Sequence, residues 1–170
     1  PDATDSPVEI LEAGRAVVNS VVTAALISIV AVTLMIFLGL RSARDTLLVL
    51  IPLLLAALYT VAATVVLSMP FNFANVIVLP LLMGLGAANG IHLVSRAREE
   101  KSSAAAFSTT TPRAIIFSSL TTIASFGCLA VSSHRGTASM GELLVISVGL
   151  TLICTLIVLP ALMQIKSKDK

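Results

Sequence analysis

Charged residues are absent from several long apolar stretches of this chain, and each stretch is long enough to cross a membrane. An α-helix rises about 1.5 Å per residue, so about 20 apolar residues span a hydrocarbon core about 30 Å thick. Residues 16–40 carry no charge, and the charge-free stretch 46–95 has room for two spans. Two further spans are expected at 114–132 and 143–164. The pattern therefore predicts five transmembrane helices.

The stretch 46–95 is divided near its middle by Ser68-Met69-Pro70-Phe71-Asn72. Proline, an aromatic side chain and asparagine together are typical of a short turn at the membrane interface. We therefore expect the second span at 46–67 and the third at 74–95. The charged and alanine-rich segment that follows predicts a short helix lying at the interface, at about 97–107.

Every span is expected to be helical, because hydrocarbon offers no partner to unpaired backbone groups. The other solution, a closed barrel, needs strands of about ten residues with alternating polar and apolar positions. The chain has no such alternation. The expected fold class is all-α, a polytopic membrane bundle of five transmembrane helices.

Three helix starts are encoded locally. Ser6-Pro7-Val8-Glu9 is a capping box with proline at the first helical position, so the first helix is expected to begin about ten residues before the membrane and to project into water. Thr111-Pro112 predicts the start of the fourth transmembrane helix, and Ser139-Met140-Gly141-Glu142 predicts a capped start of the fifth.

Lysine and arginine are divided unevenly between the two sides that five spans create. Basic residues accumulate in short cytoplasmic loops. Arg15 and Arg135 lie on one side, and nine basic residues lie on the other: Arg41, Arg44, Arg96, Arg98, Lys101, Arg113, Lys166, Lys168 and Lys170. This distribution predicts that the N-terminus is outside the cell membrane and the C-terminus is in the cytoplasm.

The composition narrows the class further. Only 12% of the residues are charged, against about 25% in an ordinary soluble domain. The net charge of +2, spread over short clusters, disfavours a nucleic-acid partner. Cys128 and Cys154 lie in apolar segments, which disfavours a disulfide or a metal site, and no enzymatic set or cofactor motif is present. Because the chain begins at Pro1 without an initiator Met or a signal peptide, we expect a piece of a longer protein.

Four stretches carry a family resemblance: FNFANVI at 71–77, GLGAANGIH at 84–92, SSLTTIASFG at 118–127 and SSHRGTASMG at 132–141. Together they resemble the hopanoid exporters of the resistance-nodulation-division (RND) superfamily. The match covers essentially the whole chain from the first helix onward, and the last of the four stretches is particular to that branch.

The resemblance implies a bacterial inner-membrane protein of twelve transmembrane helices in two similar halves. Each half has a lone helix, a large periplasmic domain and five more helices, and this chain looks like the last five. The resemblance also implies that the proton gradient drives hopanoid lipids from the inner toward the outer membrane, with a homodimer as the working form. The expected partners are therefore the N-terminal half, the periplasmic domains and a hopanoid lipid.

Polar and small residues concentrate in the third span, where they are candidates for helix contacts or an ion path. One helical face, at intervals of i, i+4, i+8 and i+11, holds Gly84, Ala88, His92 and Ser95, and we expect this face to pack closely against protein. Gly86 and Gly90 form a small-xxx-small ridge. Pro80 removes a backbone hydrogen bond and is expected to kink this helix near its middle, as a possible hinge.

The resemblance places Ala88 at the position where transporters of this superfamily carry a proton-binding aspartate. Alanine cannot titrate, so the other half supplies the acid, or the acid was lost naturally, or the alanine was introduced. Asn89 is a candidate relay partner or a packing hydrogen bond. His92 can titrate near neutral pH but lies one turn from Arg96, which also suits a structural role at the interface.

The fourth span is rich in hydroxyls, of which Thr121, Thr122 and Ser125 are candidates for a hydrated proton path facing the third span. Ser118 shares a face with Thr122 and Ser125. The alternative is that each hydroxyl bonds the carbonyl four residues before it and has no further role.

The sequence supports two main hypotheses for the function of this chain. The first is the transmembrane part of a proton-driven exporter of hopanoid-like lipids. The alternative is a sterol-sensing type of regulatory module, since a similar five-helix arrangement binds sterols. Ala88 favours this alternative slightly by removing the expected acid, whereas the loop motif at 132–141 disfavours it more. A passive channel is a weaker third hypothesis, because the chain has no selectivity ring.

Overall fold

A computed structural model describes residues 5–69 and 77–168. Five of its segments are long and apolar enough to cross a membrane, and the described ranges contain helices but no strand, which confirms the predicted all-α, five-span fold. In chain order the elements are α1 (Asp5–Leu40), α2 (Ala43–Val66), α3 (Val78–Glu99), α4 (Ser103–Phe107), α5 (Thr111–Ala130), α6 (Arg135–Ile153), the π-helical turn η2 (Cys154–Val158) and α7 (Leu159–Lys168).

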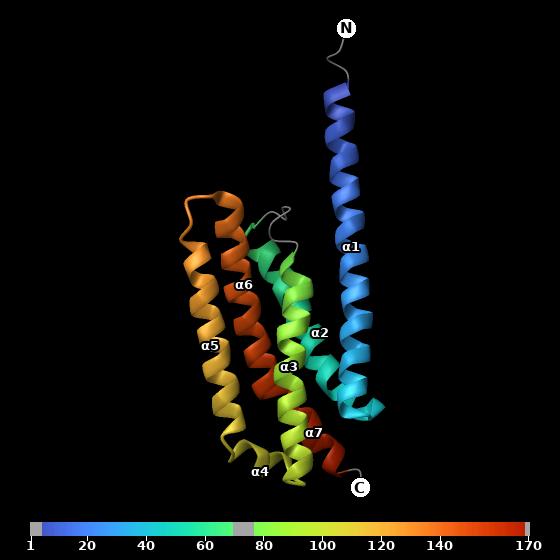
Figure 1. Ribbon diagram of the computed structural model, residues 1–170, viewed down its shortest axis with the longest axis vertical. Helices are drawn as coiled ribbons and strands as arrows, with labels where there is room; N and C mark the ends of the chain where they lie inside the picture. Colours follow the sequence, from blue (N-terminus) through green and yellow to red (C-terminus); the bar gives the residue numbers. More distant parts are fainter. Residues whose placement is uncertain (1–4, 70–76, 169–170) are drawn as a thin grey trace.

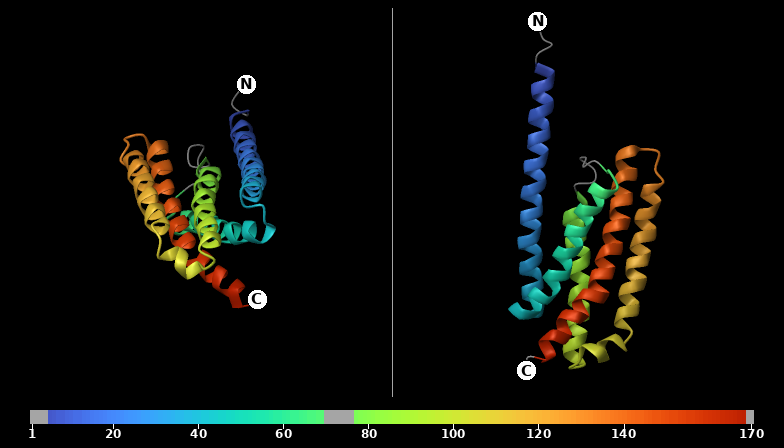
Figure 2. Two further views of the ribbon diagram at one scale, coloured as in Figure 1. Left: turned by 60° about the horizontal axis from the view of Figure 1, so that its bottom comes forward. Right: turned by 180° about the vertical axis from the view of Figure 1, so that it is seen from behind.

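Helices α5 and α6 form an antiparallel pair at one side of the bundle, and α1 stands at the opposite side, against α2 and α3 (Figures 1 and 2). With 36 residues α1 is about 54 Å long, whereas its apolar span covers only Val22–Leu40. Its N-terminal part therefore extends well past the other helices, as Figure 1 shows and as the sequence predicted.

The short connections sort the basic residues to one end of the bundle. The α1–α2 corner, the end of α3, the helix α4 and the end of α7 all gather at the lower end of Figure 1. Eight of the nine residues assigned to the cytoplasmic side belong to these segments or to the start of α5, and the ninth, Lys170, lies outside the described residues. Arg135 lies at the opposite end, at the start of α6.

Two of the predicted helix starts are wrong. Helix α6 begins at Arg135 after His134, so the supposed capping box at Ser139 lies inside the first turns of a helix that has already begun. The expected interfacial helix at 97–107 is correct only in its second half, because α3 continues to Glu99 and α4 begins at Ser103, where the side chain of Ser102 caps it. The start of α5 at Thr111-Pro112 is confirmed.

The proline in the third span does not kink it. Helix α3 begins at Val78, which places Pro80 in the first turn, where the backbone N–H groups have no partner within the helix. The expected hinge near the middle of α3 is therefore wrong. The predicted interfacial turn before it falls mainly on residues 70–76, which lie outside the described residues.

An irregularity that the sequence analysis did not predict occurs in the last span. In η2 the backbone N–H of Leu159 donates to the carbonyl of Cys154, five residues earlier, and the wider turn precedes Pro160. Proline lacks an N–H group and its ring collides with the carbonyl four residues before it, so widening the helix at this point relieves the collision. The span continues to Gln164 without breaking.

Glycines let the helices approach at three points. A Cβ atom at Gly90 would meet the side chain of Val49 on α2, and one at Gly86 would meet the side chains of Leu53 and Thr151. Gly84 has no atom within 4 Å of its would-be Cβ, so the close packing expected on its face does not occur there within this chain.

Gly141 gives the tightest crossing, between α6 and α5. A Cβ atom there would collide with the backbone nitrogen of Ala130 and would lie 2.7 Å from the carbonyl carbon of Leu129, and backbone atoms cannot rotate out of the way. Gly127, on α5, has open space around its would-be Cβ. The two glycines therefore form a matched pair for a test of packing.

We expect Gly141→Ala to lower the free energy of unfolding of the full-length transporter by about 1–3 kcal/mol, because overpacking outweighs the better helix propensity of alanine. Gly127→Ala is expected to leave stability unchanged or to raise it by up to about 1 kcal/mol. The midpoint of thermal unfolding in detergent measures both. Equal midpoints for the two variants would contradict the close α5–α6 crossing.

Candidate functional site

A polar cavity of about 550 Å³ lies between α3 and α5, in the half of the bundle next to the basic end. From α3 it is lined by Ala88, Asn89, His92, Ser95, Arg96 and Glu99, and from α5 and the residue before it by Thr110, Thr111, Ala114, Ile115 and Ser118. The face of α3 that was expected to pack closely thus borders an open space instead. A cavity with several polar partners is roomy enough to hold water.

Near the inner end of the cavity one side-chain contact joins the two helices. The side-chain amide of Asn89 donates to the hydroxyl of Ser119 at 3.5 Å, which is the outer limit of a hydrogen bond. Ser119 is buried, whereas its neighbour Ser118 is exposed in this chain. Asn89 is therefore held on α5, and its carbonyl oxygen remains available to accept a proton donor.

At the basic end, Arg96 is held by two carboxylates from the last turn of α3 and its cap. Its guanidinium lies 2.7 Å from a carboxylate oxygen of Glu99 and 3.0 Å from one of Glu100. All three side chains are at least one-third exposed, so these ion pairs contribute little to stability. They leave the entrance to the cavity polar, with His92 one turn deeper.

The structure brings Asn89 and His92 to one cavity and leaves the other relay candidates outside it. Thr121 and Ser125 are exposed and Thr122 is half-buried. Each of these hydroxyls donates to the carbonyl four residues before it, at 2.9 Å. Thr121 donates to Phe117, Thr122 to Ser118 and Ser125 to Thr121. A role for these hydroxyls in proton transfer stays a prediction.

The position where the resemblance expects a proton-binding aspartate holds the uncharged Ala88. Ala88 lines the cavity, and the nearest carboxylate on α3 is Glu99, eleven residues or about 16 Å along the helix. The cavity therefore extends from the basic end as far as Ala88 and Asn89, and α3 carries no carboxylate before Glu99. An acid that takes up a proton at this depth must come from residues other than those described.

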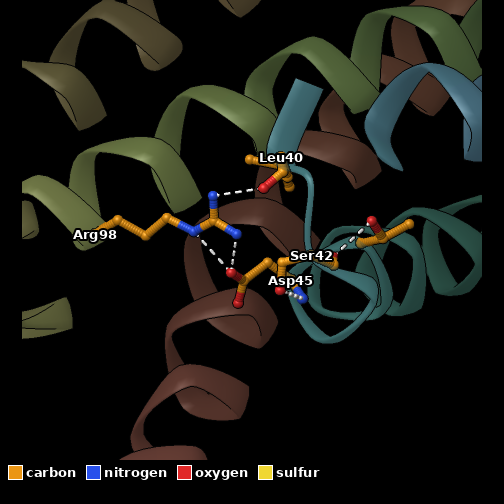
Figure 3. Close-up of polar contacts among 5 residues, drawn as sticks. Leu40, Ser42, Asp45 and Arg98 are labelled. Carbon is orange, nitrogen blue, oxygen red and sulfur yellow. Dashed lines mark hydrogen bonds and ion pairs between the residues drawn. The ribbon is translucent and has the colours of Figure 1, made fainter. Parts of the chain in front are cut away.

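A second polar cluster lies on another side of α3 and was missed by the sequence analysis. The guanidinium of Arg98 pairs with the carboxylate of Asp45 at the start of α2, with Nε 2.7 Å from Oδ2, and its Nη1 donates to the carbonyl of Leu40 at 2.7 Å (Figure 3). Asp45 is buried, and its backbone N–H is capped by the side chain of Ser42. One arginine thus joins the end of α1, the start of α2 and the end of α3.

Sequence offered a weak signal for this cluster. The charge pattern identifies Arg98 only as a topology residue, and Asp45 is 53 positions away. A lone carboxylate at the edge of an apolar span, such as Asp45, is energetically costly without a partner. This cost indicates that a cationic partner lies nearby.

The fold and the cavity together define a multi-pass membrane protein with a polar seam between two of its spans. The model of the MMPL family matches residues 11–170, and the chain belongs to the MMPL family, which is of the RND type.

Two curated relatives named "Hopanoid transporter HpnN" are similar over 163 residues, which cover 96% of this chain. The one from Rhodopseudomonas palustris is 42% identical and the one from Burkholderia multivorans is 38% identical. The chain spans only 18% of the length of each. A putative membrane protein of Methanocaldococcus jannaschii is 25% identical over 149 residues, covering 84% of this chain and 38% of that protein. The predicted membership of the RND superfamily is confirmed, and the predicted resemblance to its hopanoid exporters agrees with the names of these two relatives.

Removing Arg98 is expected to lower the free energy of unfolding more than removing the charge of its partner Asp45 does. Arg98→Met leaves the buried carboxylate of Asp45 without its guanidinium, which costs about 3 kcal/mol. Asp45→Asn keeps an acceptor for an arginine that is 41% exposed, so its cost is about 1 kcal/mol. Thermal unfolding of the purified full-length transporter measures the difference.

Arg96→Met is the matched control, because it removes an arginine from exposed partners at the same end of α3 and is expected to cost less than about 1 kcal/mol. A larger loss for Asp45→Asn than for Arg98→Met, or equal losses for Arg96→Met and Arg98→Met, would contradict the assigned geometry.

Proposed function

We propose that this chain is the five-helix membrane part of one half of a proton-driven exporter that moves hopanoid-like lipids from the inner toward the outer membrane. The observation that carries the proposal is the similarity over 96% of the chain to proteins named as hopanoid transporters. The polar cavity between α3 and α5 supports it, because a proton must cross the apolar bundle along polar groups.

In the proposed mechanism the cavity carries protons between the cytoplasm and a carboxylate supplied by the N-terminal half, near Ala88. Asn89 hydrogen-bonds that carboxylate in one of its two charge states, and Ser119 holds the amide in position. Protonation then shifts the balance between two arrangements of the helices. The long α1, which extends past the bundle, transmits the change to an external domain.

The proposed setting is the bacterial inner membrane, with the start of α1 in the periplasm and the end of α7 in the cytoplasm. Gathering of the basic residues at one end of the bundle supports this orientation. The proposed partners are the N-terminal half, the periplasmic domains and a second copy of the transporter. The sterol-sensing alternative draws no support from the family or from the names of the relatives.

The test is export of a hopanoid by the full-length transporter reconstituted in sealed vesicles, with a proton gradient and after an ionophore has collapsed it. We expect at least a tenfold loss of export without the gradient. We also expect at least a tenfold loss for Asn89→Leu with the gradient present, because the substitution removes the amide from the seam.

Thr60→Val is the matched control, since this hydroxyl on α2 donates to the carbonyl of Ala56 on its own helix and does not line the cavity, and the variant is expected to export within twofold of the unmodified protein. Export that persists at the same rate without a gradient would refute proton coupling. Equal losses for Asn89→Leu and Thr60→Val would refute the assignment of the path to the cavity.

A further inference from the structure

A second hollow lies on the opposite side of the bundle, between α1 and α2, and the proposed function does not use it. It has a volume of about 550 Å³, within the range of about 300–1,000 Å³ of small-molecule sites. Its walls are almost wholly apolar and include Val30, Leu34 and Phe37 of α1 and Leu47 and Leu50 of α2. Four of these five side chains are between 45% and 67% exposed in this chain.

The groove is confined to one leaflet. Its α1 wall runs from Ile29 to Phe37, which is eight residues or about 12 Å, and ends one turn before the α1–α2 corner. Half of the hydrocarbon core is about 15 Å thick. The groove thus has the depth of a single lipid chain that enters from the basic end of the bundle.

Two arginines stand at the polar end of this groove. Arg41 lies in the corner and Arg44 lies one helical turn before Leu47, on the same side of α2. Both side chains are exposed, and within residues 5–69 and 77–168 neither takes part in an ion pair. Asp45, the acid next to Arg44 in the sequence, is buried, and its carboxylate is paired with the guanidinium of Arg98.

We propose that this groove binds an anionic phospholipid of the leaflet at the basic end, with one acyl chain between α1 and α2 and the phosphate held by Arg41 and Arg44. An apolar groove takes a lipid chain of any headgroup, whereas two unpaired cations at its mouth select a negative one. The lipid fills the gap between two helices that otherwise meet mainly at their corner. It therefore fixes the position of α1 relative to α2.

The corner itself provides a variant that removes charge without damaging the fold. Arg41 has a φ of 49°, in the left-handed region that ends many helices, and its N–H donates to the carbonyl of Phe37 at 2.7 Å. Glycine adopts this conformation more readily than arginine does. Arg41→Gly combined with Arg44→Gln is therefore expected to fold normally.

The experiment measures lipid binding to the full-length transporter by native mass spectrometry, with phosphatidylglycerol and phosphatidylcholine as probes. We expect the unmodified protein to prefer phosphatidylglycerol and the double variant to lose about 10- to 30-fold in its affinity for that lipid, at unchanged affinity for phosphatidylcholine. Arg41→Lys with Arg44→Lys is expected to retain the preference. Arg113→Gln, an exposed arginine at the same end but on α5, is expected to change the affinity less than twofold.

A photoactivatable phosphatidylglycerol locates the site. We expect crosslinks within 29–37 and 43–50, and we expect Leu34→Trp, which fills the groove, to abolish them. The proposal is overturned if the double variant binds phosphatidylglycerol unchanged, or if Arg113→Gln lowers affinity as much. It is also overturned if both lipids bind equally, or if crosslinks persist in Leu34→Trp. None of these outcomes depends on hopanoid export or on the proton gradient.

Discussion

The guanidinium of Arg98 is the point on which the arrangement of α1, α2 and α3 depends. From the last turn of α3 it reaches a backbone carbonyl at the end of α1 and a buried carboxylate at the start of α2 (Figure 3). Apolar contacts hold α1 mainly near its C-terminal end, because Ile36 and Leu40 are the only residues of Val22–Leu40 that are buried within this chain. The charge-assisted hydrogen bond from Arg98 to the last carbonyl of α1 therefore fixes the position of this end of the helix more closely than apolar packing alone does.

The other faces of α3 have different neighbours. With Arg98 turned toward α2, the ridge of Gly86 and Gly90 meets Val49 and its neighbours, and the face that carries Ala88 and His92 turns toward α5. The polar cavity and the apolar groove consequently lie on different sides of the bundle. One side suits protons and water, and the other suits a lipid chain.

Sequence predicted the spans well because the rule behind them is simple. A charge such as Arg41 or Arg96 ends a span, and the helix between two such charges needs only length and apolar side chains. The finer signals were less reliable. Ser139-Met140-Gly141-Glu142 has the residues of a capping box, but α6 has already begun at Arg135, four residues before Ser139. Pro80 was read as a kink only because the start of α3 was placed four residues too early.

The sequence predicts two residues of the candidate site but not the contacts that surround them. Asn89 and His92 could be named because a polar side chain inside an apolar span is costly and therefore conspicuous. Their surroundings could not be named, since the partners of α3 depend on how α5 rotates about its own axis. That rotation turns Ser119 toward Asn89 and leaves Thr121 and Ser125 bonding their own helix. Arg98 and Asp45 were missed because they lie 53 positions apart on α3 and α2, and the sequence does not show which ends of these helices meet.

The central claim is that the seam between α3 and α5 is a water-filled cavity open to the cytoplasm. It is tested by a single cysteine at Ser118 in a full-length transporter whose other cysteines are replaced, with a maleimide that cannot cross membranes. We expect rapid labelling in inverted vesicles and none in right-side-out vesicles, while a cysteine at Leu58, which is 63% exposed on an apolar surface, stays unlabelled in both. Labelling of Ser118→Cys from the periplasmic side only, or from neither side, would contradict the account.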